Sequence, residues 1–201
     1  ILIFSSVTTV AYAEDVLIIH EGYANSHSKW KNRLEDAGHT VTSVNITSAS
    51  FPSDTTSYEQ IYDVRYSNSY TMTSSLQTHY KALIEDELGG GTITYGSSNA
   101  GNSITQHNSS ESWLSSFSGT LTFVAAGKLT AIGNGTWIAK DGSGNIVAAV
   151  WYGDDLSSSY TGKVIVITDI NFNSHSTYYT QTNKNWMNAM RTMLASTYNT
   201  A

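Results

Sequence analysis

The chain of 201 residues contains no cysteine, a single proline and few charged residues. The lack of cysteine excludes disulfides, thiolate metal sites and a cysteine nucleophile. Charged residues make up 13% of the sequence, about half the usual share, and the net charge is −6. No run of lysine or arginine supplies the basic stripe that nucleic-acid binding requires. The sequence therefore indicates neither thiol chemistry nor a nucleic-acid partner.

The residues that replace the missing charges are mainly polar and uncharged. Serine, threonine, asparagine, glycine and 13 tyrosines are abundant, while hydrophobic residues still make up 40% of the chain. We therefore expect a globular protein with a surface exposed outside the cell, either extracellular or at the cell surface, with the periplasm as an alternative. The length suits one domain with a sizeable core, and no internal repeat or linker divides residues 14–201.

Residues 1–13, ILIFSSVTTVAYA, form an apolar and uncharged segment that ends in an A-x-A pattern before Glu14. This pattern is typical of the apolar region and cleavage site of a secretory signal. The alternative is a retained β-prone segment that adds as a strand to the open sheet edge of a neighbouring subunit. The segment is too short to span a bilayer as a helix, so we expect no transmembrane span. Both interpretations place the protein outside the cytoplasm.

Hydrophobic patterns along the rest of the chain predict alternating strands and helices, as in an α/β protein. Two continuous apolar runs, at 15–20 and 162–170, are expected to be buried parallel strands. A β-hairpin is expected across 136–152, with its turn at 141–144. The other expected elements are helices at 28–38, 73–88, 111–117 and 183–195, and strands at 39–44, 58–65, 92–95 and 121–125.

Several short motifs follow one another in a set order. They are Val16-Leu17-Ile18-Ile19, Tyr62-Asp63-Val64-Arg65, Gly89-Gly90-Gly91 before a strand, Asn99-Ala100-Gly101, and the run from Val164 to Phe172. In this order and spacing the chain resembles secreted bacterial members of the class I glutamine amidotransferase-like superfamily. The resemblance implies a flavodoxin-like three-layer sandwich, with a mainly parallel central sheet, helices on both faces and, here, an added β-hairpin.

The resemblance also bears on activity. Active members of that superfamily carry a cysteine at a strand–turn–helix elbow, and a histidine and a glutamate after a later strand. At the matching places this chain has Ser97-Ser98-Asn99 and Asp169-Ile170-Asn171. The resemblance therefore implies a catalytically degenerate member.

The elbow region offers a second, catalytic interpretation. Residues 96–100, GSSNA, match G-x-S-x-A, close to the nucleophile elbow of serine hydrolases. In that case Ser98 is the nucleophile, Asp169 and His175 complete the triad, and the backbone N–H of Asn99 supplies the oxyanion hole. The alternative is a tight polar turn without catalytic function.

A ligand site is a further hypothesis, at the carboxyl ends of the expected parallel strands. His20 and Glu21 follow the first strand and Arg65 ends another, so a single sheet would place them at one edge with Asn99 and Asp169. Such a cluster is suited to an anionic sugar. The alternatives are hydrogen-bonded surface histidines and an Arg65 that pairs with a neighbouring carboxylate.

Neither a metal site nor a cofactor is expected. The six histidines show no H-x-H or H-E-x-x-H spacing, which is a poor signal for a metal. No glycine-rich phosphate loop follows the first strand, so a nucleotide cofactor is not expected either.

The leading functional hypothesis is an exported, non-catalytic amidotransferase-like domain that acts as a structural or binding subunit. We expect it to associate with other copies of itself through residues 1–13 and the edge of the sheet formed by the hairpin. Trp137 and Trp151 on this hairpin form a sticky patch if both point outward. The alternatives are a serine hydrolase that uses Ser98, and a carbohydrate-binding module with glycans as its partners.

Overall fold

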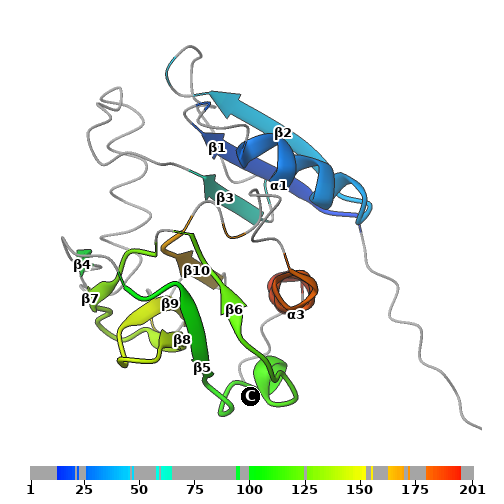
Figure 1. Ribbon diagram of the computed structural model, residues 1–201. Coiled ribbons are helices and arrows are strands. Elements are labelled where there is room, and N and C mark those ends of the chain that lie inside the picture. The colour runs from blue at the N-terminus through cyan, green and yellow to red at the C-terminus, as the bar shows by residue number, and fades with distance from the viewer. Residues whose placement is uncertain are drawn as a thin grey trace, which may run out of the picture.

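A computed structural model gives the arrangement of the chain (Figure 1). It describes residues 13–20, 22, 26–45, 47, 58, 60–64, 94–95, 100–124, 126–152, 155, 163–169, 172 and 180–195. The helix expected at 73–88, most of the elbow and nearly all of the segment 1–13 lie outside the described residues.

The first sheet is small and parallel. Strand β1 (Asp15–His20) lies between β2 (Thr40–Asn45) and β3 (Gln60–Val64), and it is parallel to both. Helix α1 (Ser26–Glu35) connects β1 to β2 and contacts both strands. Four consecutive residues of β1, Val16–Ile19, are at most 3% exposed, because a central parallel strand is covered on both faces. The β–α–β unit expected from the sequence is confirmed here.

The second sheet is larger and antiparallel. Its order is β4 (Thr94–Tyr95), β7 (Leu129–Ala131), β9 (Ile146–Tyr152), β8 (Thr136–Asp141), β5 (Ser103–His107) and β6 (Leu121–Thr122). Strand β10 (Lys163–Ile167) also pairs with β9, beyond the short contact that β9 makes with β7. A 3₁₀ helix, η3 (Ser112–Leu114), follows β5, where a short helix was expected at 111–117.

The expected flavodoxin-like three-layer sandwich is wrong. Every pairing in the larger sheet is antiparallel, and only β1, β2 and β3 pair in parallel among the described residues. Strand β10 was expected to be a buried parallel strand, but it runs antiparallel to β9 from Lys163 opposite Tyr152 to Ile167 opposite Ala148. An apolar run shows that a strand is buried, and it carries no information about the direction of its neighbour.

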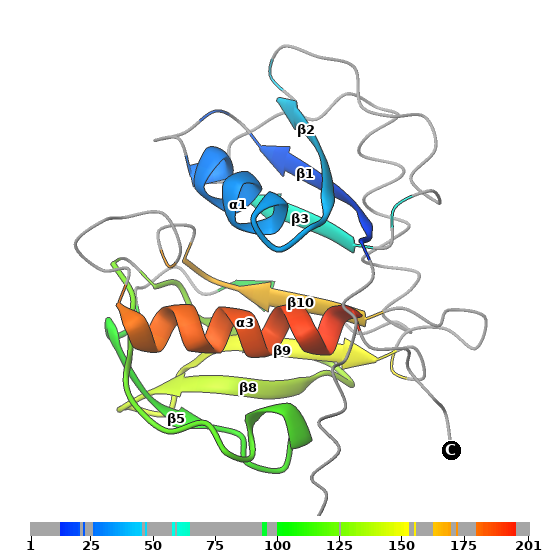
Figure 2. The same cartoon turned by 90° about the vertical axis from the view of Figure 1, so that its right-hand side faces the viewer.

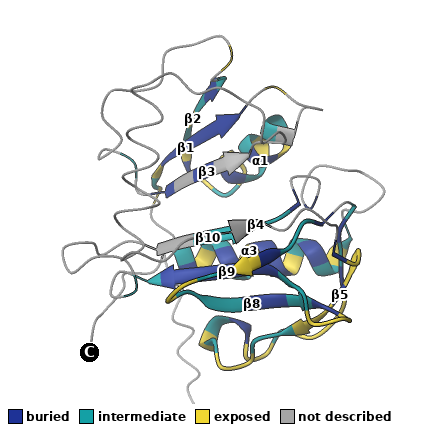
Figure 3. Ribbon diagram, turned by 90° about the vertical axis from the view of Figure 1, so that its left-hand side faces the viewer, coloured by how far each residue is buried: buried dark blue, intermediate teal, exposed yellow. Residues whose placement is uncertain are grey.

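The hairpin β8–β9 is confirmed, but its expected position at the edge of the sheet is wrong. Strand β8 is also bonded to β5, and β9 is also bonded to β7 and β10. The hairpin is therefore the centre of the larger sheet, and its backbone groups are already paired with neighbours. This agrees with the burial of β9, in which Val147 to Trp151 are all fully buried (Figure 3).

Helix α3 (Gln181–Ala195) packs against the larger sheet and joins the two halves of the core (Figure 2). Its buried face carries Trp186, Met187, Met190 and Met193, of which Met187 was not expected, while Leu194, which was expected there, is only partly buried. These residues belong to one hydrophobic cluster that also includes β1 and β3 of the parallel sheet and β5, β8 and β9 of the antiparallel sheet. The two sheets therefore share this cluster, and Leu129, Ala149 and Trp151 form a second, smaller one in the larger sheet.

The two hairpin tryptophans do not form an exposed pair. Trp151 is fully buried, and its indole N–H donates to the carbonyl of Ile132 at 3.0 Å. The turn before β8 covers the ring so closely that a Cβ on Gly135 would lie 2.3 Å from it. Trp137 is only partly buried, and the Lys140 ammonium lies 4.1 Å from the centre of its ring. The prediction of a shared patch is wrong for Trp151, because the turn folds back over it.

Candidate functional site

Asp169 is the one member of the expected triad that the structure describes. It is 5% exposed, and its Oδ2 accepts the backbone N–H of Val124 at 2.6 Å. Ser98 and His175 lie outside the described residues, as do Asn99, Glu21 and Arg65. The triad therefore stays a prediction, while the described contact of Asp169 is with the backbone of the segment that follows β6.

Asp169 acts together with Asn183 to close the edge of the larger sheet at β6. Asn183 is fully buried; its Oδ1 accepts the N–H of Thr122 at 3.0 Å, and its Nδ2 donates to the carbonyl of Thr122 at 2.8 Å. The same Nδ2 also donates to the carbonyl of Phe172 at 3.2 Å. A neighbouring strand would make the same pair of bonds to Thr122, so one amide side chain takes the place of a strand.

This role of Asn183 was not found from the sequence. The signal is an asparagine three residues before Trp186, on the apolar face of α3. A buried amide needs partners for its donors and its acceptor, and backbone groups of an edge strand supply them.

His20 ends β1 and packs under the start of α1. It is 7% exposed, and its ring stacks on that of His27 with 3.7 Å between centroids and 4° between planes. Its Nδ1 accepts the N–H of Gly22 at 3.0 Å, which assigns the proton of the neutral ring to Nε2. Burial, and then the neighbouring His27, lower the pKa of His20 to about 4. His20 is therefore neutral at pH 7, and its Nδ1 already accepts a hydrogen bond from the backbone of the loop that follows β1.

The expected cluster of His20 with Asp169 at one sheet edge is wrong. His20 ends the central strand of the parallel sheet, whereas Asp169 follows β10 of the antiparallel sheet. Parallel strands of one sheet share a carboxyl edge, and these two strands belong to different sheets. The carbohydrate hypothesis assumed that these residues lie at one edge of one sheet, and the structure does not support that assumption.

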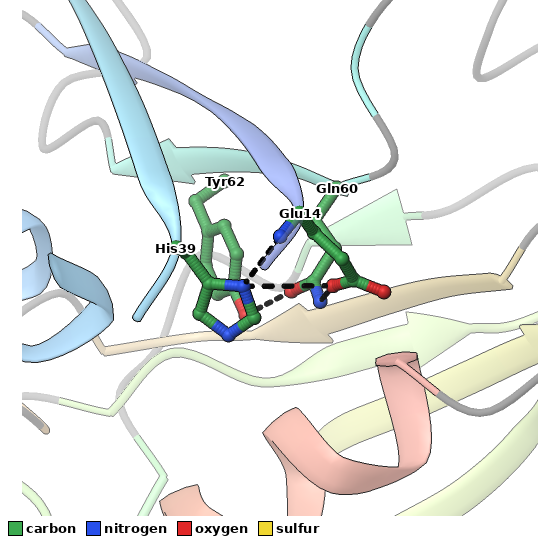
Figure 4. A network of polar contacts seen from close by, with 4 residues as sticks. All are labelled: Glu14, His39, Gln60 and Tyr62. Atoms are coloured by element: carbon green, nitrogen blue, oxygen red, sulfur yellow. Dashed lines mark hydrogen bonds and ion pairs between the residues drawn. The ribbon is translucent and has the colours of Figure 1, made fainter. Parts of the chain in front are cut away.

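A buried polar network lies at the amino end of the parallel sheet (Figure 4). Tyr62 donates to Gln60 Oε1 at 2.7 Å, the Gln60 amide donates to the Glu14 carboxylate, and Glu14 lies 3.8 Å from His39 Nδ1. Burial raises the pKa of Tyr62, and it lowers the pKa of His39, where the charges of Glu14 and Arg191 act in opposite directions. The network joins the starts of all three parallel strands, and it was not predicted from the sequence.

Asp141 holds the turn of the hairpin. Its Oδ1 accepts the N–H groups of Ser143 and Asn145, both at 2.9 Å, and its Oδ2 accepts the N–H of Gly101 and the Asn145 amide, both at 2.8 Å. Burial alone raises the pKa of Asp141, but these hydrogen bonds outweigh it and lower the pKa to about 2. All of the described contacts of this carboxylate are within the protein, and they fix the turn.

Within the part of the chain that the structure describes, no three histidine, aspartate or glutamate side chains are grouped so as to hold a metal ion. None of its helices has the length and apolar character needed to cross a bilayer.

No protein-family model matches the chain, and no curated protein or solved structure is significantly similar to it. The resemblance to the amidotransferase-like superfamily therefore stays a prediction, and the fold that it implied is wrong.

Proposed function

We propose that the protein is an exported, non-catalytic subunit that acts by associating with other copies of itself. The observation that carries the proposal is the outer edge of β2. Among the described strands, β2 pairs with β1 alone, and Figures 1 and 2 place it on the side of β1 away from the larger sheet. An edge strand offers a row of unpaired backbone N–H and C=O groups to another chain.

The strand β2 itself carries no charge, proline or bulge that would hinder such pairing. Its sequence, TVTSVN, contains no charge and no proline, and its register with β1 runs from Asp15–Thr40 to His20–Asn45 without a bulge. Thr40 and Thr42 are exposed, whereas Val41, Ser43 and Asn45 are half-buried and Val44 is buried. Soluble proteins commonly protect an edge of this length with lysine, proline, a bulge or a covering loop.

Two edges of the larger sheet, at β6 and at β4, carry features that hinder pairing with another chain. Asn183 and Asp169 occupy the backbone groups of Thr122 and Val124 at the β6 edge. At the opposite edge, β4 has only two residues, and its register with β7 shifts. The β6 edge of the larger sheet is therefore sealed by buried side chains, whereas β2 pairs with no described strand other than β1.

One further feature supports the proposal. The sequence is poor in charge and rich in serine and threonine, which suits an exported protein.

Sedimentation velocity from about 1 to about 100 μM protein tests self-association, because assembly depends on concentration by mass action. We expect the sedimentation coefficient to rise with concentration. A monomer at every concentration refutes the self-association. Fluorophosphonate labelling that is lost in Ser98→Ala refutes the non-catalytic part of the proposal.

A further inference from the structure

We infer that the chain is cut between Ala13 and Glu14, and that the amino group freed on Glu14 binds the ring of His39. The inference rests on the export named in the proposed function, and it assigns a processing site that removes residues 1–13. A protease hydrolyses the bond: water adds, Ala13 ends in a carboxylate and Glu14 begins with an ammonium group. The other interpretation of residues 1–13, as a strand given to another copy, requires them to stay on the chain.

The residues before this bond suit a protease that removes secretory signals. Such a protease requires small side chains at the last and third-last positions before the cut, and an apolar stretch upstream. Ala11 and Ala13 occupy these two positions, with Tyr12 between them, and residues 1–10 are uncharged. The sequence pattern therefore allows the cut, and the structure shows which contacts the new end of the chain makes.

The structure places the bond at the border of the folded domain. Ala13 is exposed and belongs to no strand, and β1 begins two residues later at Asp15. The pairing of β1 starts at Asp15 with β2 and at Val16 with β3. A cut before Glu14 therefore leaves every described strand pairing of the parallel sheet intact.

Glu14 is held by three contacts within the described part of the domain. Its carbonyl accepts the N–H of Thr40 at 2.9 Å, and its carboxylate accepts the side-chain amide of Gln60. Its backbone N–H donates to His39 Nδ1 at 3.4 Å (Figure 4). A chain that begins at Glu14 keeps all three contacts, whereas a chain that begins at Asp15 loses them.

The same contacts suit the charge that the cut creates. An α-amino group is mainly protonated at neutral pH, so it needs an acceptor and a nearby negative charge. His39 Nδ1 is the acceptor, because the nitrogen of Glu14 already donates to it. The Glu14 carboxylate lies 3.8 Å from the same ring nitrogen, and its negative charge opposes that of Arg191, which also acts on His39. A charged donor forms a stronger hydrogen bond than the neutral amide that it replaces.

Mass spectrometry of the protein from the cells that produce it tests the cut. After trypsin digestion, we expect a peptide that begins at Glu14 and ends at Lys29, and none that spans the bond between Ala13 and Glu14. Ala13→Leu should lower the fraction of chains that begin at Glu14 at least about tenfold, because leucine is not a small residue. Tyr12→Leu is the matched control, and it should be cut like the unmodified protein, since the middle position of the pattern is not restricted.

NMR of the ring nitrogens of His39 in the exported protein tests the binding of the new amino group. We expect the neutral ring to carry its proton on Nε2, because Nδ1 accepts from Glu14. A proton on Nδ1 overturns the binding of the amino group to His39. An exported protein in which this bond is intact, or that is cut elsewhere, overturns the inference and keeps the proposed function. A protein that stays inside the cell overturns both.

Discussion

Replacement of Asn183 by alanine should destabilise the protein strongly, because its amide closes the edge of the larger sheet. The variant loses the bond from the Thr122 N–H at 3.0 Å and the bonds to the carbonyls of Thr122 and Phe172 at 2.8 and 3.2 Å. At the start of α3 it keeps the bond from the backbone N–H of residue 183 to Thr180 Oγ1, but it loses the bond from Thr180 Oγ1 to Asn183 Oδ1 at 3.2 Å. The effect therefore reports mainly on the sealed edge, with a smaller part from the helix cap.

The size of the effect follows from the backbone groups left without partners. A buried polar group without a partner costs about 1–3 kcal/mol, and one N–H and two carbonyls are affected. Thr122 is only partly buried, so water reaches some of these groups and reduces the cost. We expect the free energy of unfolding to fall by about 3–5 kcal/mol, a large part of the roughly 5–15 kcal/mol of a typical domain.

Urea unfolding at 25 °C, followed by circular dichroism, measures this change. The matched control is Asn188→Ala, because Asn188 is an exposed asparagine on the same helix. The control should change stability by no more than about 0.5 kcal/mol. If the unfolding free energy of Asn183→Ala lies within about 1 kcal/mol of that of the control, the amide does not seal the edge of the sheet.

Three further predictions concern the turns and the titrating groups. Gly135→Ala should cost about 2–3 kcal/mol in urea unfolding, because the new Cβ meets the Trp151 ring at 2.3 Å, while Gly142→Ala, with nothing closer than 4.0 Å, should be nearly neutral. The pKa of Asp141 is lowered to about 2 from 3.8, so the stability that this carboxylate contributes should be present above pH 4 and lost as the pH falls through 2. Asp141→Asn should lose this part of the pH dependence of unfolding. A variant whose stability varies with pH as in the unmodified protein contradicts the prediction. The pKa of His20 is lowered to about 4 from 6.5, so an NMR titration should show a neutral ring at pH 5, and stability should fall as the pH drops from 6.5 towards 4.

Local elements could be predicted from the sequence where one pattern dominates. The apolar run at 15–20 and the helical spacing of Trp186, Met190 and Met193 each correspond to a described element. The hairpin was also predicted, because its turn residues follow directly from local backbone chemistry. The strand β5 was missed, since its sequence SITQH has only one buried apolar residue, Ile104.

The candidate site was harder to predict, since the role of each of its residues depends on the groups that face its side chain in the folded protein. Asp169 was expected to orient a catalytic histidine, and the structure shows it bound to the N–H of Val124. The role of Asn183 depends on Thr122, which lies 61 positions away in the sequence. Residue type shows that a buried carboxylate or amide needs hydrogen-bond partners. Which backbone groups become those partners depends on how α3 packs on the sheet.

The sequence by itself determined the local periods of burial, the absence of thiol chemistry and the uncharged character of β2, because these depend on residue type and spacing alone. The tertiary structure decided the direction in which β10 pairs, the burial of Trp151 and which described strand ends the parallel sheet at β2. The physical reason is that strand pairing joins backbone groups, which are the same in every residue. Which strands become neighbours is therefore settled by the packing of the whole chain and not by any one segment.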